Sequence, residues 1–300
     1  MARKRVISRS ARSWLFGVAV VVTAAVAIAL TLLAFDHVQS RTPDGPETSA
    51  PVFAPATPSP SPSATDIPAA APYDPATQRF IAVGDGVVWR GTAGVCGGTA
   101  PSLERSVDDG ETWTDVLPEY LEIGQLLALD AFDGSQAEIV AGRGAACEVQ
   151  LLRTFTQGEF WASYPDVLAR SAYVDASTPR LIIVSGAPIE GPCDESHGLR
   201  RWGGSVAIVC GKIAYVLGEQ TWMPLDVPNV LAIAPDGDDL VLASNANACD
   251  GIALRRFAVD GSSVDAGCVE TSAPVPALAL SSVSESITLW SGDDWIKLPR

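Results

Sequence analysis

The distribution of apolar and polar residues divides the chain into three regions. Residues 14–35 contain no charged residue and are apolar almost throughout, and about 20 such residues are enough to cross the hydrocarbon core of a bilayer. Residues 36–77 show no apolar period, whereas residues 78–300 consist of short apolar or alternating stretches separated by turn residues. The pattern predicts a transmembrane helix over 14–35, a linker over 36–77 and an all-β domain over 78–300.

The charges around the apolar segment predict its orientation. Five basic residues lie within residues 1–13, and Asp36 follows the segment. The positive-inside rule therefore leaves residues 1–13 in the cytoplasm and places the C-terminal domain outside the cell. This predicts a single-pass protein of the cell membrane. A cleaved signal peptide with a cleavage site at Val38-Gln39-Ser40 is the alternative, but its apolar region is usually only about 7–15 residues long.

The linker has a composition that cannot bury a core. Residues 36–77 contain ten prolines, all between Pro43 and Pro75. Such a segment samples the extended polyproline II conformation and behaves as a semi-rigid spacer of about 3.1 Å per residue. We therefore expect a disordered, Pro/Ala/Ser-rich linker that holds the C-terminal domain away from the membrane.

Two degenerate repeats recur within residues 78–300. One is an apolar strand that ends in a small residue, and the other is a Leu-x-Arg strand. The first repeat occurs at 81–84, 139–142, 183–186, 242–245 and 289–292. The second begins at Leu103, Leu151, Leu199 and Leu254, at intervals of 48, 48 and 55 residues.

This period matches one four-stranded blade of a β-propeller, which is typically about 40–50 residues long. We predict five blades, with six as the alternative if residues 198–226 form an additional short blade. The last repeat lacks one strand, and residues 79–84 are a candidate to complete it and so close the ring.

One stretch gives these repeats a family resemblance. Residues 106–113 read Ser-Val-Asp-Asp-Gly-Glu-Thr-Trp, which fits the pattern Ser-x-Asp-x-Gly-x-Thr-Trp. This resembles the Asp-box, or BNR repeat, of sialidases, sortilin-type receptors and photosystem II assembly factors. Residues 154–161 keep the glycine and tryptophan of the motif, and residues 218–222 keep only its tail.

The resemblance implies a structural role for the motif. It implies a hairpin turn on the rim of a blade, with Ser106 and Asp108 accepting hydrogen bonds from backbone N–H groups. Gly110 supplies a positive φ, Thr112 completes the motif, and Trp113 covers the hairpin.

Charge excludes one class of partner. Residues 78–300 carry 30 acidic and 14 basic side chains, a net charge of about −16. Such a surface repels phosphate backbones, so the sequence gives no indication of nucleic-acid binding.

All six cysteines lie in the predicted exported domain. Outside the cytoplasm an even number of cysteines indicates disulfides, although six allow fifteen connectivities. Spacing favours the pairs Cys193–Cys210 and Cys249–Cys268, which leaves Cys96–Cys147. No Cys-x-x-Cys pair is present, and His197 is the only histidine after the linker, so no metal or cofactor is predicted.

Candidate ligand-binding residues are the paired arginines Arg200–Arg201 and Arg255–Arg256. A guanidinium group binds a carboxylate in a fork geometry, and we expect the two pairs on adjacent blades. The alternative is that these arginines pair with nearby acids on the rim. No catalytic residue is predicted, because a sialidase-like active site needs an arginine cluster, a Tyr–Glu pair and an acid/base aspartate that the sequence does not reveal.

The sequence therefore predicts a non-enzymatic binding or scaffolding module for an envelope protein or a cell-wall polymer. An exo-glycosidase of the sialidase type is the competing hypothesis. The identity of the ligand does not follow from the residues.

Overall fold

The computed structural model describes residues 73–299, except residues 203, 247, 259, 272–276 and 284–285. These residues lie in one compact unit, Ile67–Arg300. No helix within the described part of the chain is long and apolar enough to cross a membrane. The predicted anchor over 14–35 and the linker up to residue 72 lie outside the described residues.

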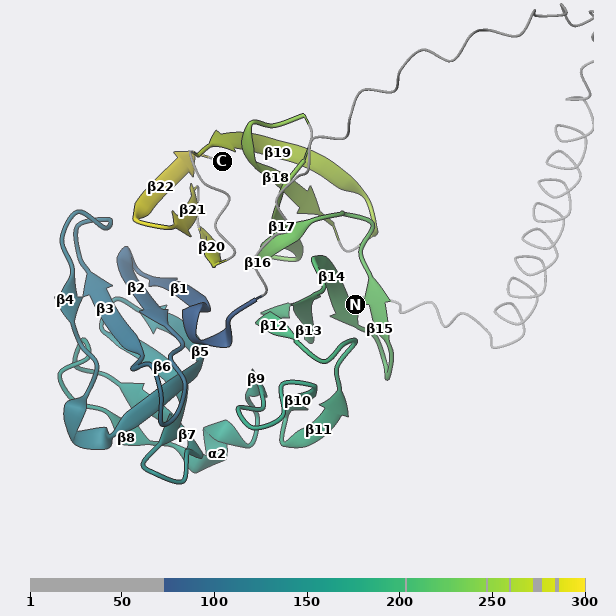
Figure 1. Ribbon diagram of the computed structural model, residues 1–300. Helices are drawn as coiled ribbons and strands as arrows, with labels where there is room; N and C mark the ends of the chain where they lie inside the picture. The colour runs from purple at the N-terminus through teal and green to yellow at the C-terminus, as the bar shows by residue number, and fades with distance from the viewer. Residues whose placement is uncertain are drawn as a thin grey trace, which may run out of the picture. The chain divides into compact units, whose positions relative to one another are not determined.

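Short antiparallel strands form six sheets arranged around a common centre, which is a six-bladed β-propeller (Figure 1). Blade 1 contains β1(Arg79–Gly84), β2(Val87–Thr92), β3(Ser102–Ser106) and β4(Thr114–Asp115). Blade 2 contains β5(Ile123–Asp133), β6(Gln136–Arg143), β7(Glu148–Thr154) and β8(Ala162–Ser163). Blade 3 contains β9(Ala172–Val174), β10(Leu181–Val184) and β11(Ala187–Glu190). Blade 4 contains β12(His197–Trp202), β13(Ser205–Cys210), β14(Ile213–Leu217) and β15(Trp222–Pro224). Blade 5 contains β16(Val230–Asp236), β17(Asp239–Ser244), β18(Gly251–Phe257) and β19(Ser263–Glu270). Blade 6 contains β20(Leu278–Val283), β21(Ser286–Ser291) and β22(Asp294–Pro299). The described residues also form the short helix η1(Pro75–Thr77) before β1, and the short helices η2(Glu119–Leu121) and α2(Pro165–Leu168) between strands.

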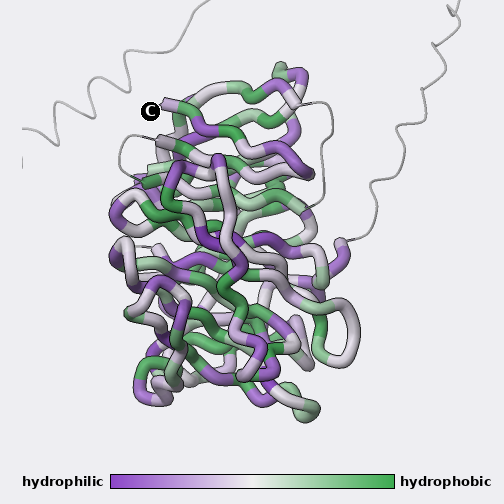
Figure 2. The backbone as a smooth tube through the Cα atoms, turned by 90° about the vertical axis from the view of Figure 1, so that its left-hand side faces the viewer, coloured by the Kyte–Doolittle hydropathy of each residue, from purple (hydrophilic) through white to green (hydrophobic). Residues whose placement is uncertain are grey.

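Local sequence explains why the chain reverses where it does. Asp85 and Gly86 join β1 to β2 with φ angles of 44° and 80°. Positive φ at both central residues is the geometry of the two-residue hairpin turn that matches the twist of the flanking strands. The side view in Figure 2 shows hydrophobic and hydrophilic positions alternating along the stacked blades.

The propeller has two faces, which we name by what they carry. The turn face carries the hairpin between the first and second strands of each four-stranded blade and the turn at residues 106–113. The disulfide face carries the opposite loops, with all six cysteines in or next to them.

The number of blades differs from the five that the repeats favoured. Residues 197–224 form a complete four-stranded blade and not an additional short one. The short blade is blade 3, whose three strands span residues 172–190. The first repeat marks blade 3 at residues 183–186 and has a member in every blade except blade 4, which is why it indicates five. The Leu-x-Arg series has no member in blade 3.

The Leu-x-Arg series mixed two different strands. Leu103, Leu151 and Leu254 lie in the third strands β3, β7 and β18. Leu199, by contrast, lies in β12, the innermost strand of blade 4. The prediction that Leu199 is an equivalent repeat position is therefore wrong. A glycine stands seven residues after each of the other three leucines, whereas Val206 stands there after Leu199.

Ring closure also differs from the prediction. In the described part of the chain β1 pairs only with β2, and the sixth sheet contains β20, β21 and β22 alone. Blade 6 instead packs face to face on blade 1 through Ile81, Val88, Ala279 and Trp290. Residues 79–84 therefore do not complete the last blade.

The three predicted disulfides are present. Cys96–Cys147 joins blade 1 to blade 2 across a Cα–Cα distance of 6.0 Å. Cys193–Cys210 fastens the chain leaving blade 3 to blade 4, and Cys249–Cys268 lies within blade 5.

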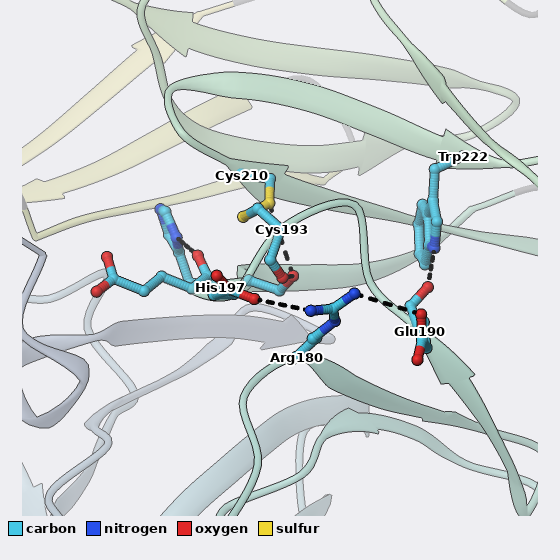
Figure 3. The surroundings of a disulfide bond; sticks show 9 residues. Arg180, Glu190, Cys193, His197, Cys210 and Trp222 are labelled. Carbon is cyan, nitrogen blue, oxygen red and sulfur yellow. Dashed lines mark hydrogen bonds and ion pairs between the residues drawn. A yellow bond between two sulfur atoms is a disulfide. The ribbon is translucent and has the colours of Figure 1, made fainter.

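Figure 3 shows the surroundings of the Cys193–Cys210 disulfide. Arg180 contacts both Glu190 (3.4 Å) and Asp194 (3.3 Å). The indole N–H of Trp222 donates to the carbonyl of Glu190 at 2.8 Å. The segment between blades 3 and 4 is therefore held by a covalent bond together with polar contacts.

Candidate functional site

A cavity of about 320 Å³ lies at the centre of the ring. The innermost strands of all six blades line it: β1, β5, β9, β12, β16 and β20. Most of the lining is small or apolar, and its only charged side chains among the described residues are Asp130, Arg200 and Arg201. The Oγ of Ser282, which also lines this cavity, has no hydrogen-bond partner among the described residues. We call this space the central cavity.

Asp130 is placed by β5 so that its side chain is exposed to the water of the central cavity, deep inside the ring. Surrounding protein removes much of the bulk solvent, and this raises the pKa of Asp130 to about 6. The positive charge of Arg200 opposes the increase, whereas Glu138 adds to it. Asp130 therefore changes its charge in the pH range just below neutrality.

The two arginines reach the cavity from β12 on the opposite side of blade 3. Arg200 donates from Nη1 to the carbonyl of Leu199 at 2.9 Å. Burial lowers the pKa of the Arg200 guanidinium, and Asp130 opposes this decrease. Arg201 donates from Nη1 to the carbonyl of Arg170 at 2.7 Å, which fixes it at the edge of the cavity.

A second cavity of about 290 Å³ adjoins the first, and we call it the side cavity. It lies between blade 2 and the segment that carries α2 and the start of β9. Asp130, Ala172 and Arg201 line both cavities. Of these shared residues, Asp130 and Arg201 are charged.

The strand register of blade 2 places an acidic and basic row along the side cavity. Asp130 in β5 is the cross-strand partner of Glu138 in β6, and Glu138 is the partner of Arg153 in β7. Arg153 donates to Glu138 Oε2 from Nε at 2.7 Å and from Nη2 at 2.5 Å. Directly opposed residues project from the same face of a sheet, so all three side chains face the side cavity.

Blade 3 is the reason that this space exists. Ala172, at the start of β9, lines the central cavity, whereas Val174, at its end, lines a cavity on the disulfide face. In β5 the order is reversed, since Leu127 lines the disulfide-face cavity and Asp130 the central one. The short β9 thus runs against its neighbours, and α2 and the following loop replace a regular innermost strand.

The local charge of the two cavities is opposite to that of the domain. Together they are lined by four arginines, at 153, 170, 200 and 201, and by two acids, Asp130 and Glu138. This concentration of positive charge occurs in a region that carries about −16 overall. Guanidinium groups in such an arrangement are suited to hold a carboxylate.

Arg255 and Arg256 do not join this group. They lie in β18, the third strand of blade 5, where Arg255 contacts Asp265 at 3.0 Å and Arg256 contacts the buried Asp236 at 2.9 Å. The structure therefore separates the two arginine pairs that the sequence suggested as one site.

The turn at residues 106–113 is held by side-chain hydrogen bonds. Ser106 Oγ accepts from the backbone N–H of Gly110 at 2.8 Å, and Asp108 Oδ1 accepts from the backbone N–H of Thr112 at 2.9 Å. Thr112 and Ser106 also donate through their hydroxyls to Asp108, and these bonds lower the pKa of Asp108 to about 2. Gly110 has a φ of 96°. These contacts are local to the turn, away from the residues that line the central cavity.

Residues 154–161 form a similar turn in blade 2. Thr154 Oγ1 accepts from the N–H of Gly158 at 3.0 Å, and Thr156 Oγ1 accepts from the N–H of Phe160 at 2.9 Å. Trp161 lies in the apolar cluster between blades 1 and 2. Trp113 contributes instead to the cluster between blades 6 and 1, so each tryptophan packs at an interface between blades.

A third cavity, of about 280 Å³, lies on the disulfide face. Tyr73 stacks on His197 with ring centroids 4.0 Å apart and donates to Gln78 Oε1 at 2.7 Å. Burial raises the pKa of Tyr73 and lowers that of His197. The last residues assigned to the linker by sequence, including η1, therefore pack against the propeller.

Sequence reasoning found Arg200 and Arg201 but missed their partners. Asp130, Glu138, Arg153 and Arg170 are spread over 40 residues of sequence and belong to no motif. The available signal was the charged row within strands that are otherwise apolar, because Glu138 and Arg153 interrupt β6 and β7.

Comparison with known proteins identifies no family for this chain. No protein-family model and no curated protein matches the sequence. Similar solved structures include YCF48 bound to D1 peptide (16% identity, 70% of this chain and 74% of that chain, TM-score 0.40). Trypanosoma rangeli sialidase is also similar (13% identity, 72% of this chain and 53% of that chain, TM-score 0.41). So is a putative glycosidase from Bacteroides thetaiotaomicron (11% identity, 72% of this chain and 83% of that chain, TM-score 0.38). The chain thus spans about half the length of the sialidase, and its function has to be argued from its own residues.

Proposed function

We propose that this protein is a non-enzymatic binding module that holds a carboxylate group of its ligand in the central cavity. The observation that carries the proposal is the gathering of four arginines around two acids in an acidic domain. Arg200 and Arg201 approach from one side and Asp130 from the other, in a space that all six blades enclose. The arginines outnumber the acids by two, and a bound carboxylate would offset part of this positive charge.

We further propose that the module is anchored in the cell membrane by residues 14–35 and works outside the cell. Three disulfides support an oxidising compartment, and the uncharged segment after a basic N-terminus supports the anchor. A protein or polymer of the cell envelope is the corresponding partner.

A hydrolase is the second candidate, and one observation favours it. Asp130 has a raised pKa of about 6 and lies directly across from Glu138, and a protonated acid next to an ionised carboxylate is the pair that glycoside hydrolysis uses. Against this, Arg153 holds Glu138 Oε2 with two nitrogens. In addition, no tyrosine is among the described residues that line the two cavities.

Cross-linking in intact cells followed by capture of the tagged full-length chain tests the proposal. The wild-type chain is compared with Arg201→Gln, which removes a cavity guanidinium. Arg255→Gln is the matched control, because Arg255 lies on the adjacent blade outside the cavity. We expect one envelope component to be captured by the wild type and by Arg255→Gln, and to be lost with Arg201→Gln.

The same preparations separate the two candidate functions. Purified full-length chain is incubated with chromogenic glycosides, including sialic and uronic acid derivatives. Release of chromophore that is abolished by both Asp130→Asn and Glu138→Gln would replace the binding proposal with a hydrolase. Capture that Arg201→Gln leaves unchanged would show that the cavity is not the binding site.

A further inference from the structure

Five of the six interfaces between neighbouring blades contain a buried apolar cluster. Within the described residues these clusters join blades 1 and 2, 3 and 4, 4 and 5, 5 and 6, and 6 and 1. The interface between blades 2 and 3 contains no such cluster in that part of the chain and holds the side cavity with its charged residues instead. Apolar burial is the main source of stability at such contacts, so one interface lacks what stabilises the others.

An aromatic patch lies next to this interface on blade 2. We define it as Phe132, Phe155 and Tyr164. Phe132 and Phe155 are 46% and 48% exposed and meet edge to face with centroids 6.3 Å apart, and Phe155 and Tyr164 are 6.0 Å apart. Large apolar side chains that cluster at the surface commonly mark an interaction site.

Arg153 connects the aromatic patch to the side cavity. Its guanidinium lies 5.1 Å from the ring of Phe132 and 5.6 Å from that of Tyr164. The same guanidinium is bound to Glu138, and both residues line the side cavity. The cavity and the patch therefore form one continuous surface, with positive charge at its inner end and exposed rings at its outer end.

We infer that this surface binds a polypeptide segment of a partner protein that carries a carboxylate and, close to it along the chain, a large apolar side chain. The inference rests on the proposed function, because it takes the carboxylate to the arginines of the cavities. It adds that the ligand enters through the gap beside blade 3 and that it carries an apolar side chain next to the carboxylate. The apolar side chain packs on Phe132 and Phe155 while the carboxylate reaches the guanidinium groups.

The composition of the patch favours a peptide over a glycan. Two of its three rings are phenylalanines, which offer no hydrogen bond to sugar hydroxyls, and they meet at 72° and so present no flat platform. The net charge of about −16 on residues 78–300 disfavours a polyanion, since long-range repulsion would oppose its approach. A segment with one or two carboxylates fits both the local positive charge and the acidic surroundings.

A printed array tests the inference with defined probes. It carries hexapeptides in which one Asp or Glu and one Phe or Leu are placed at every spacing, each also in a form with the acid amidated or the apolar residue replaced by Gly. Uronic acid oligosaccharides are printed beside them. The full-length chain, kept in mild detergent, is applied as wild type, as Phe132→Ser/Phe155→Ser and as Arg201→Gln.

Phe160→Ser is the matched control, because Phe160 is 63% exposed on the same blade but lies outside the patch. We expect the wild type and this control to select peptides that carry both groups. Loss of two partly exposed rings is expected to weaken this binding about 10-fold, and Arg201→Gln is expected to abolish the preference for the acid.

The outcomes distinguish this inference from the proposed function. In one outcome, acidic peptides bind whether or not they carry the apolar residue, and bind equally well to Phe132→Ser/Phe155→Ser. That result would overturn the inference and leave the carboxylate-binding proposal in place. Selection of the oligosaccharides in place of peptides would overturn the peptide assignment. If the wild type selects no acidic probe at all, both are wrong.

Discussion

Two interfaces between neighbouring blades differ in what fills the space between their sheets. Blade 6 meets blade 1 without a shared strand, and this interface is filled by aromatic and apolar side chains. Arg79 and Arg90 lie over the ring of Trp290 at 4.3 and 4.9 Å, and Trp113 and Trp295 meet edge to face at 5.0 Å. The interface between blades 2 and 3 is instead lined by charged side chains around a cavity.

The comparison separates an interface that closes the ring from one that leaves space for the proposed ligand. The interface of blades 6 and 1 closes the ring, and its polar groups make hydrogen bonds and an ion pair between the two blades. Trp295 Nε1 donates to the carbonyl of Asp109 at 2.9 Å, and Lys297 binds the Asp109 carboxylate at 2.7 Å. The interface of blades 2 and 3 leaves its arginines next to open space. The first is built for closure, and the second leaves room for a ligand.

Trp290→Ala should produce the largest effect, because it empties the centre of the closing interface. Trp290 is 7% exposed, and loss of a buried aromatic side chain typically costs about 3–5 kcal/mol. Urea unfolding followed by tryptophan fluorescence measures the loss. Phe160→Ala on the exposed surface is the control. If both variants lose the same free energy of unfolding, the closing interface contributes no more to stability than the exposed surface does.

Removal of the disulfide that joins blades 1 and 2 should come next. Cys96 and Cys147 are 51 residues apart, and closing a loop of that length stabilises the folded state by about 4 kcal/mol on the chain-entropy estimate. We expect Cys96→Ser/Cys147→Ser to lower the urea midpoint more than Cys249→Ser/Cys268→Ser, whose separation is 19 residues. The reverse order would contradict this account.

A smaller effect is expected at the charged row of blade 2. Arg153→Met leaves Glu138 without its partner and should cost about 1–3 kcal/mol, since the pair is partly buried. Arg153→Met/Glu138→Met should recover most of this loss, because two apolar residues replace an ion pair at little cost. Differential scanning calorimetry measures both. If the double variant is as unstable as the single one, the row is needed for folding and the functional interpretation of this interface weakens.

The smallest effect concerns pH. Asp130 titrates near pH 6 in the folded protein and near 3.9 when unfolded, so the folded state binds more protons between these values. The contribution of this group to stability therefore decreases as pH rises from about 4 to 6. Protonation also removes a negative charge facing Arg200, Arg201 and Glu138.

We therefore expect affinity for an acidic hexapeptide to increase about 3- to 10-fold between pH 7.5 and pH 5.5. Fluorescence anisotropy across this range measures it, with Asp130→Asn as the control that should bind with little pH dependence. An unchanged dependence in Asp130→Asn would assign the titration to another group.

Much of the fold was predictable because β-propellers repeat in sequence. The repeat spacing indicated a propeller, and cysteine spacing predicted all three disulfides. Blade 4 remained only an alternative because the first repeat series has no member between residues 197 and 224. Ring closure escaped because face-to-face packing of Trp290 on Arg79 leaves no pairing signal in the sequence.

The candidate site was predictable only in part. Arg200 and Arg201 stood out as adjacent charges, but their partners depend on strand register. Asp130 meets Glu138 only because of the way β5 and β6 pair, and irregularities in that pairing shift the register three times. The aromatic patch depends on Arg153 lying between Phe132 and Tyr164, which no single segment of sequence indicates.

The placement of the disulfides has a mechanical consequence. Cys96–Cys147 makes blades 1 and 2 one covalently linked block, and Cys193–Cys210 ties the exit of blade 3 to blade 4 as another. The boundary between these two blocks is the interface without an apolar cluster. When the ring is strained, by heat or by tension on the chain, we therefore expect the two blocks to separate at this interface first.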